Sequence, residues 1–255
     1  MFLRMLPLYS LLILIGICDA SEAPRPIRGN IDLLNEEGQA KIKDFRTHTV
    51  VTATTNPDLI ILHGNTTQKI VALTFSEGPN AETKNLLTVL MANNIKATFF
   101  FSGEVIDKNK DFVKTIADNG HSVLSHGWKH VRFPTLSREE ILTVIKAGEN
   151  ALQEAIGNHP PLMRTPYGYT TPTTLSVLKE LELSTVLWSI DTLDWAPDST
   201  KETIFANVVG TIQPGDIVLF HSRKITVEAL PAIIDALKKL DYHFVTIPEL
   251  LATPS

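Results

Sequence analysis

The chain has 255 residues, of which 44% are hydrophobic and 20% charged, with a formal net charge of -5 and a pI near 5.9. This length and apolar content suit one large globular domain, or two small ones, with a well-buried core. The negative charge gives no electrostatic reason to expect binding to nucleic acid or to an anionic membrane surface. A neutral or cationic polymer is the better match to this composition.

The N-terminus has the pattern of an export signal. Arg4 precedes an almost wholly apolar run from Leu6 to Ile17, which is short for a membrane span, and Ala20 supplies a small residue before Ser21. We therefore predict a signal peptide over residues 1–20 and a protein that is secreted, periplasmic or held in the cell envelope, without a stable membrane anchor. Lipidation at Cys18 and an uncleaved anchor are the less favoured alternatives, because bulky Ile17 precedes this cysteine. Cys18 is the only cysteine, so the mature chain is expected to contain no disulfide.

Residues 21–68 carry no recognisable chemistry. Two apolar runs, Val50 to Thr54 and Leu59 to Leu62, are separated by the turn signal Asn56-Pro57-Asp58. The pattern predicts an N-terminal extension with a small hairpin that packs on the main domain.

From residue 69 to residue 251, strand-like and helix-like segments alternate. Such alternation predicts an α/β fold with a parallel sheet and crossover helices, and about seven units in this length favour a distorted (β/α) barrel. The expected strands are short and rich in Val, Ile and Phe, and they lie at Ile70–Phe75, Ala97–Phe101, His121–Ser125, Leu162–Arg164, Thr185–Ile190, Ile217–Phe220 and Phe244–Ile247. The first is followed by a helical pattern over Ala81–Asn94.

Two histidines, His126 and His130, stand four positions apart. Borderline-soft divalent metals favour neutral imidazole together with carboxylate, so the pair is a candidate metal site. Gly127 discourages a helix, which indicates ligands on a loop. The alternative is a pair of histidines that pack or cap on one helix face.

Several polar residues share one property, which is that each stands at the end of an expected strand or shortly after it. In a parallel barrel the carboxyl ends of the strands meet at one face, where active sites are assembled. The residues in question are Ser76, Glu77, His126, Arg164, Asp191, Asp194 and His221. We therefore expect these residues to lie together at the carboxyl end of the barrel, which we call the mouth.

These residues belong to motifs whose order and spacing resemble a known family. The motifs are Thr74–Asn80, Ala97–Phe100, His126–His130, Arg164–Gly168, Asp191–Trp195 and Leu219–His221. Together they resemble the polysaccharide deacetylases of carbohydrate esterase family 4, the NodB homology group, over about residues 69–250.

The resemblance implies hydrolysis of the acetamide of an N-acetylated amino sugar. It implies that Glu77, His126 and His130 hold one divalent metal ion, with zinc preferred. It also implies that His221 is the general acid, kept protonated by Asp194.

The remaining roles implied by the resemblance concern the substrate. Arg164 would orient the base, the amide of Tyr167 would donate to the oxyanion, and Pro166 would lie beside it at the substrate. Trp195 and Leu219 would wall the acetyl pocket. The plain alternatives are that Trp195 and Leu219 are core residues, that Arg164 and Asp191 form a surface ion pair, that His221 is structural and that Glu77 serves a helix dipole.

The first motif departs from the family pattern. The family carries two successive aspartates there, the base and then a metal ligand, whereas this chain has Ser76 and Glu77. A hydroxyl is no base at neutral pH, and loss of a general base costs ~10²–10⁴-fold in rate.

Two hypotheses from different classes follow from this substitution. One is a metal-dependent deacetylase acting on a glycan polymer, with peptidoglycan N-acetylglucosamine first among the substrates, then chitin oligosaccharides and acetylxylan. The other is a catalytically impaired relative that binds glycan in the same groove.

Overall fold

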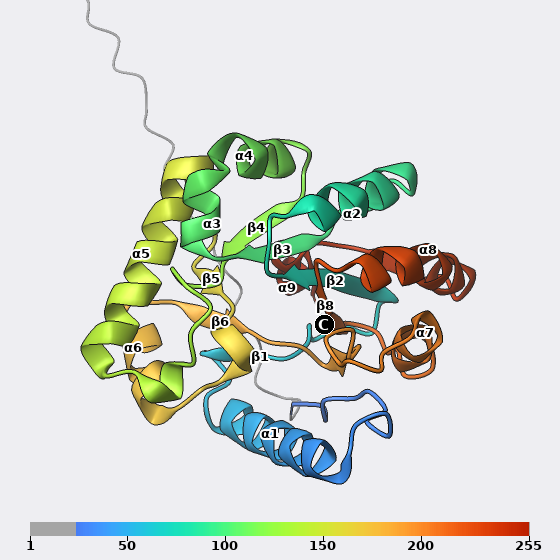
Figure 1. Cartoon of the computed structure of the whole chain (residues 1–255), viewed down its shortest axis with the longest axis horizontal. Helices are drawn as coiled ribbons and strands as arrows, with labels where there is room; N and C mark the ends of the chain where they lie inside the picture. Colours follow the sequence, from blue (N-terminus) through green and yellow to red (C-terminus); the bar gives the residue numbers. More distant parts are fainter. Residues whose placement is uncertain (1–23, 255) are drawn as a thin grey trace, which may run out of the picture.

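The computed structural model describes residues 24–254, so the expected signal peptide, residues 1–20, lies outside the described residues. Within them, helices flank a curled parallel sheet (Figure 1). No helix between residues 24 and 254 is long and apolar enough to span a membrane.

The elements alternate between strand and helix for most of the chain. Their bounds, in chain order, are α1 (Glu36–Thr55), β1 (Ile60–Ile61), β2 (Ile70–Ser76), α2 (Ala81–Ala92), β3 (Thr98–Phe101), α3 (Gly103–Lys108), α4 (Lys110–Asp118), β4 (Ser122–Ser125), η1 (Phe133–Thr135), α5 (Arg138–Ile156), β5 (Leu162–Met163), η2 (Pro166–Gly168), α6 (Pro172–Glu180), β6 (Ser184–Val186), β7 (Ile190–Asp191), α7 (Lys201–Val209), β8 (Ile217–His221), α8 (Lys224–Lys239), β9 (His243–Phe244) and α9 (Ile247–Ala252).

The sheet confirms the predicted barrel-like α/β fold. Its strands follow the order β1-β6-β5-β4-β3-β2-β8-β7, with β9 paired to β2, and every pair of named strands is parallel. The sheet curls into a half-barrel, and nine strands among the described residues replace the expected seven or so. The difference arises because the expected strand Thr185–Ile190 is divided into β6 and β7 and because β1 joins the sheet.

The division between β6 and β7 explains how the sheet curls. β6 pairs with β5 and β1, whereas β7 pairs with β8 at the other end of the strand order. Between them, the amide of Leu187 donates to the carbonyl of Ile61 (2.8 Å) and the amide of Ser189 donates to that of Ile217 (3.0 Å). One short stretch of chain thus contacts both ends of the sheet and holds it in a curved form.

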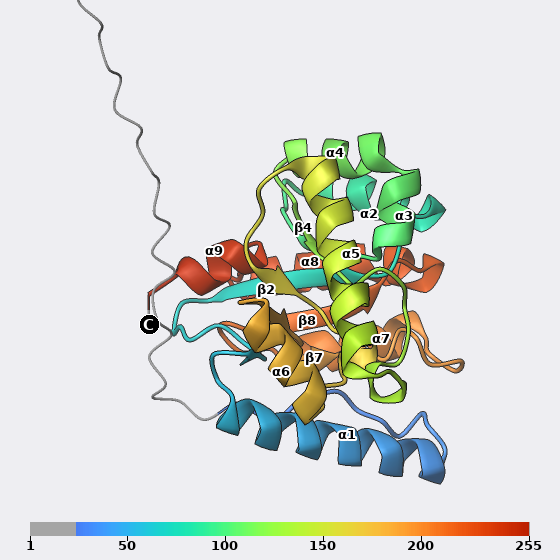
Figure 2. The ribbon, with the colours of Figure 1, turned by 90° about the vertical axis from the view of Figure 1, so that its left-hand side faces the viewer.

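The hairpin predicted for the N-terminal extension is wrong. Val50 to Thr54 belongs to α1, and the segment Leu59 to Leu62 contains β1, which pairs in parallel with β6. The β-branched composition misleads here because tertiary packing overrides propensity: Thr49 and Ala53, four residues apart, form a buried stripe on one face of the helix. Asn35 caps the helix by accepting from the amide of Gly38. Figure 2 shows α1 running along one side of the molecule.

Strand β2 shows how the two faces of the sheet are used. Val71, Leu73 and Phe75 point to one core cluster, where the Phe75 ring stacks on Phe99 and Phe220 at centroid distances of 5.3 and 5.4 Å. Side chains alternate along a strand, so Ala72, Thr74 and Ser76 point to the other face, which is the barrel interior. Ser76, the last residue of β2, is therefore at the interior end of its strand.

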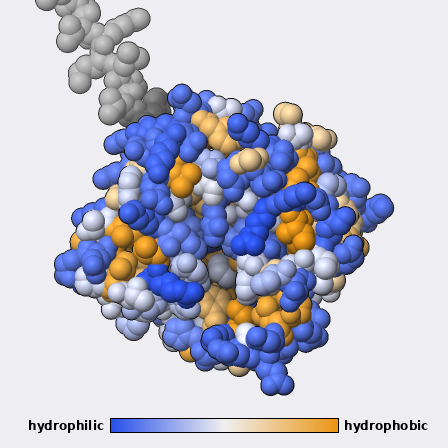
Figure 3. Space-filling model, viewed as in Figure 1, coloured by the Kyte–Doolittle hydropathy of each residue, from blue (hydrophilic) through white to orange (hydrophobic). Residues whose placement is uncertain are grey.

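The strand ends on this interior face lie side by side. In the β2–β8 register, Ser76 is the partner of His221. Figure 3 shows the face toward which β2 runs, which is hollowed near its centre, with both hydrophilic and hydrophobic residues bordering the hollow. This mouth is where the strand-end residues meet.

Candidate active site

His126 begins the loop that follows β4, and the loop is not helical, as expected. Its imidazole is buried, and Nδ1 lies 2.7 Å from the carbonyl oxygen of Arg164. This contact fixes the ring and leaves Nε2 for a ligand. Gly127 turns the chain with a φ of +73°, and a Cβ on Gly148 of α5 would lie 2.5 Å from its carbonyl carbon. The absence of side chains at both positions lets α5 approach the loop closely.

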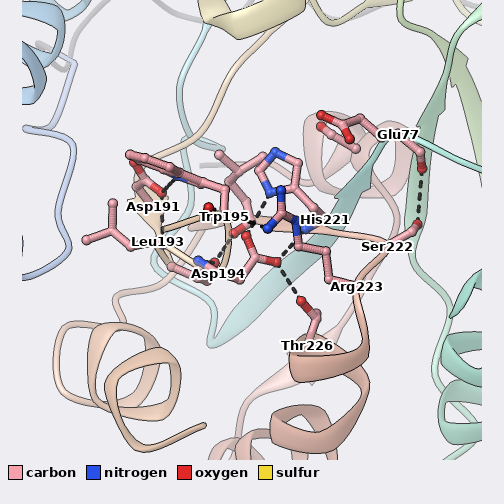
Figure 4. A network of polar contacts seen from close by, with 12 residues as sticks. Glu77, Asp191, Leu193, Asp194, Trp195, His221, Ser222, Arg223 and Thr226 are labelled. Atoms are coloured by element: carbon pink, nitrogen blue, oxygen red, sulfur yellow. Dashed lines mark hydrogen bonds and ion pairs between the residues drawn. The ribbon is translucent and has the colours of Figure 1, made fainter. Parts of the chain in front are cut away.

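His130 and Glu77 face each other across the mouth. Nε2 of His130 lies 3.8 Å from Oε1 of Glu77, and the His126 and His130 ring centroids are 5.0 Å apart. Glu77 adopts the left-handed conformation with a φ of 66°, which is uncommon for a residue other than glycine. Its backbone is held at both ends, because its amide donates to Phe100 O (3.1 Å) and its carbonyl accepts from the Ser222 hydroxyl (3.1 Å; Figure 4).

The chemistry of these three side chains suits a divalent metal, although they do not converge on a common point. Burial is the largest cause that lowers the pKa of both His126 and His130, so both imidazoles are neutral near pH 7, as metal ligands must be. Within residues 24–254, no three His, Cys, Asp or Glu side chains are grouped closely enough to hold a metal. The Glu77 side chain is 44% exposed and faces His130. The donor types fit a divalent metal, and a side-chain movement is needed to bring the three ligands together.

His221 and Asp194 are joined in a network of hydrogen bonds at the mouth (Figure 4). Nδ1 of His221 lies 2.7 Å from Asp194 Oδ1, and the His221 amide donates to Asp194 Oδ2 across 2.7 Å. The Thr226 hydroxyl donates to the same oxygen (2.6 Å). Burial opposes a charged imidazole, but the adjacent Asp194 outweighs it and raises the pKa of His221. The ring is thereby oriented and its protonated form is favoured, as a general acid requires.

Ser76 and Arg164 occupy the position where the family pattern expects a base and its orienting arginine. Both side chains are buried, and Nη1 of Arg164 donates to the Ser76 hydroxyl across 3.2 Å. Among the described residues, no carboxylate lies within 4 Å of this guanidinium. The charge of Arg164 therefore meets a hydroxyl where the family has an aspartate.

Arg164 also supports the backbone. Its Nε donates to Val186 O (2.8 Å) and its Nη2 to Leu187 O (2.9 Å), the carbonyls at the break between β6 and β7. The guanidinium stacks over the Phe100 ring at 4.0 Å. A buried guanidinium with these partners is not a member of a surface ion pair, so that alternative for Arg164 and Asp191 is wrong.

Tyr167 stands at the rim of the mouth, in η2. It has a φ of 59° and is 40% exposed, and its ring lies 4.2 Å from that of His130. Pro166, which begins η2, is buried. Left-handed residues other than glycine tend to occur at functional sites, and this conformation turns the Tyr167 backbone while leaving its ring exposed.

Asp191, Trp195 and Leu219 form one neighbourhood at the β7–β8 end of the sheet. Asp191 and Leu219 are register partners, and Asp191 Oδ1 accepts from the indole Nε1 of Trp195 (3.2 Å) and the amide of Leu193 (3.0 Å). Leu219 is buried in the interior core, and Trp195 packs beside Ile31 of the N-terminal extension. Their expected role as pocket walls stays a prediction.

The structure adds residues that sequence reasoning missed. Arg46 of α1 reaches Asp191, with Nη2 3.9 Å from Oδ2, and Phe45 stacks on Trp188 at 6.0 Å. The guanidinium of Arg132 lies over the Tyr167 ring, 4.2 Å from its centroid. Thr226, in the first turn of the helix after His221, secures Asp194. The sequence offers one signal for Thr226, which is its position five residues after the strand-end residue His221.

Comparison with known proteins agrees with this geometry. The family model described as Polysaccharide deacetylase matches residues 63–186. A peptidoglycan-N-acetylglucosamine deacetylase of Bacillus cereus is 37% identical over 189 residues, which cover 72% of this chain and 68% of the relative. A Listeria monocytogenes protein of the same name, PgdA, is 36% identical, and the match spans 72% of this chain but only 39% of that longer relative.

Solved structures show the same fold with both active and inactive members. The Bc1960 peptidoglycan N-acetylglucosamine deacetylase superposes with a TM-score of 0.74 at 33% identity, covering 80% of this chain and 97% of that one. A CE4 family pseudoenzyme of Bacillus anthracis, BA3943, gives a TM-score of 0.70 at 28% identity, covering 76% and 69%. A mutant of BA3943 is described as having restored enzymatic activity, with a TM-score of 0.71 at 30% identity, covering 76% and 71%. By its motifs, its curled parallel sheet and these relatives, the chain belongs to the polysaccharide deacetylase family of hydrolases, carbohydrate esterase family 4.

Proposed function

We propose that the protein is a metal-dependent deacetylase of an extracytoplasmic amino-sugar polymer, with N-acetylglucosamine of peptidoglycan as its substrate. The observation that carries the proposal is the hydrogen-bonded pair of His221 and Asp194, which faces the mouth that also contains His126 and His130. A largely buried imidazole, 14% exposed, with a raised pKa has the properties of a general acid. The names of the Bacillus and Listeria relatives support the choice of polymer.

In the proposed reaction, water adds to the acetamide carbonyl, the carbon–nitrogen bond breaks, and acetate and a free amine are released. His221 gives its proton to the leaving nitrogen, and Asp194 stabilises the imidazolium. The amide of Tyr167 would donate to the oxyanion. A divalent ion, zinc by preference, held by His126, His130 and Glu77, would supply Lewis acidity toward the carbonyl.

The proton of the attacking water needs an acceptor other than residue 76. Glu77 is half exposed at the mouth, and its carboxylate makes no hydrogen bond to any described residue. The carboxylate of Asp194, in contrast, is occupied by His221 and Thr226. Under this proposal Glu77 is both a ligand and the nearest available acceptor, which predicts a slow enzyme.

The test combines metal content with acetate release. The purified protein is incubated with peptidoglycan, chitin oligosaccharides and acetylxylan, and released acetate is compared between the native chain and His221→Gln. Acetate release from peptidoglycan that requires His221 would support the proposal. Equal release by His221→Gln, or release from acetylxylan alone, would contradict it.

A second candidate function is glycan binding without hydrolysis. It is favoured by the contact between Arg164 and Ser76, which places a hydroxyl where a proton acceptor is required. The similarity to a CE4 pseudoenzyme supports this candidate too. Binding of glycan strands with no acetate released by the native chain would select it.

We also propose that the protein is exported, because of the apolar run that follows Arg4. Cell fractionation followed by N-terminal sequencing tests this. A mature start near Ser21 in the envelope or medium would support export, and intact Met1 on cytoplasmic protein would contradict it.

A further inference from the structure

An arginine at the rim of the mouth is fixed by aromatic rings. The guanidinium of Arg132 lies 4.2 Å from the centroid of the Tyr167 ring and 5.6 Å from that of Tyr169. Its Nη1 donates to the Tyr169 hydroxyl across 3.0 Å. Stacking on aromatic faces suits the planar guanidinium and reduces the freedom it loses when it binds a ligand.

The remaining donors of Arg132 have no protein partner. Its Nε and Nη2 make no hydrogen bond to any residue between 24 and 254, and no carboxylate in that range lies within 4 Å of it. The contrast is Arg138, a surface arginine that is paired with Glu180. Arg132 therefore presents free N–H groups that match the two oxygens of a carboxylate.

The place of this arginine connects it to the reaction. The Tyr167 ring under Arg132 also lies 4.2 Å from the ring of His130. A sugar unit adjoining the one whose acetamide enters the mouth would thus lie against Tyr167 and within reach of Arg132.

The acidic groups of the mouth leave this charge uncompensated. Asp194 is paired with His221, and Asp191 is buried and faces Arg46. Glu77 is the one exposed carboxylate that we place at the mouth, and it faces His130. The rim at Arg132 is locally cationic although the whole chain has a net charge of -5.

We propose that Arg132 is a specificity-determining residue that binds a carboxylate on the sugar next to the N-acetylated one. The ligand class is a polymer of N-acetylated amino sugars in which alternate units carry an ether substituent with a free carboxylate, as in muramic acid without a stem peptide. The inference rests on the proposed function, since it assumes that the mouth takes a glycan. It adds the chemical feature that separates this polymer from chitin.

Binding to three tetrasaccharides tests the inference by calorimetry. The probes are a tetrasaccharide of alternating N-acetylglucosamine and N-acetylmuramic acid, the same compound with its carboxylates converted to primary amides, and chitotetraose. The native protein should bind the acidic probe about 10-fold or more tightly than the amidated one. This ratio of affinities should decrease as the salt concentration rises. Arg132→Gln should remove this preference and leave the affinity for chitotetraose within about twofold, and Arg132→Lys should keep part of it.

Two matched variants separate recognition from charge. Arg138→Gln removes an arginine that is partly exposed and paired with Glu180, and it should change nothing. Arg223→Gln removes an exposed arginine near His221. The Nη1 of Arg223 donates to Trp195 O across 3.4 Å, and this variant should keep most of the preference for the acidic probe. If Arg223→Gln abolishes the preference as fully as Arg132→Gln, general attraction replaces specific recognition and the inference fails.

The outcomes distinguish this inference from the proposed function. Equal affinity of the native protein for acidic and amidated probes overturns the inference alone. Equal loss of all three probes in Arg132→Gln also overturns it, because Arg132 would then only support Tyr167. Binding of none of the three overturns the inference and the proposed function together. A carboxylate preference without acetate release supports the inference and contradicts the hydrolase.

Discussion

Nη1 of Arg164 and the hydroxyl of Ser76 are joined by a hydrogen bond of 3.2 Å in the interior of the barrel. The pair brings a cation to the end of β2 without a matching anion. The oxygens of an aspartate side chain lie one bond further from Cβ than the hydroxyl of serine, and they would bring a negative charge to the same guanidinium. The contact therefore identifies the change with the greatest expected effect on activity.

Ser76→Asp should raise acetate release from N-acetylglucosamine polymers by up to ~10²–10⁴-fold, because it restores a proton acceptor beside Arg164. Initial rates of acetate formation measure the effect. Ser76→Asn is the matched control, since it has nearly the same shape but cannot accept the proton. An equal gain in both variants would show that side-chain size, and not basicity, limits the native rate.

The purified protein should bind one zinc ion per chain, and changing His126 and His130 together to Ala should abolish binding. Elemental analysis and zinc titration measure the stoichiometry. His243→Ala, an exposed histidine on β9, is the control and should retain the metal. Full metal content in the double variant would exclude this site.

The pKa of His221 should lie above its ordinary value of 6.5, and Asp194→Asn should lower it, because Asp194 is what stabilises the imidazolium. Titration of the ring by NMR measures both. A raised pKa in the folded state gives stability that is fully present below about pH 6.5, the unfolded value, and is lost as pH rises through the folded value. Asp194→Asn should remove this part of the pH dependence. Thr226→Val removes one hydrogen bond to Asp194 and should leave the pKa of His221 raised. If the pKa of His221 falls to its ordinary value in this variant, the charge of Asp194 alone does not raise it.

Arg46→Met should destabilise the fold by ~3 kcal/mol, because it leaves the buried carboxylate of Asp191 without its cation. Urea unfolding measures the change. Arg138→Met breaks an ion pair in which both side chains are exposed and should cost ~1 kcal/mol or less. If the two variants lose equal stability, α1 does not support the mouth through Arg46.

The sequence allowed the fold and the place of the mouth to be predicted, because strand-end residues are readable from short apolar runs. Phe75 and Phe220, for example, mark strands whose next residues are Ser76 and His221. The part that could not be read depends on contacts between distant segments. Arg46 contacts Asp191 from α1, a helix whose β-branched residues led to the prediction of a strand. Arg132 contacts Tyr167, which lies 35 positions later in the chain. Neither pairing has a local pattern.

The place of Arg164 also bears on how the chain can change over generations. Its guanidinium binds the carbonyls of Val186 and Leu187, so the curved sheet needs this arginine whether or not the site turns over substrate. Selection for folding alone would then preserve the orienting group of a missing base. A single substitution at residue 76 would place a carboxylate beside Arg164. Inactive and active relatives can therefore arise from one another while the barrel stays the same.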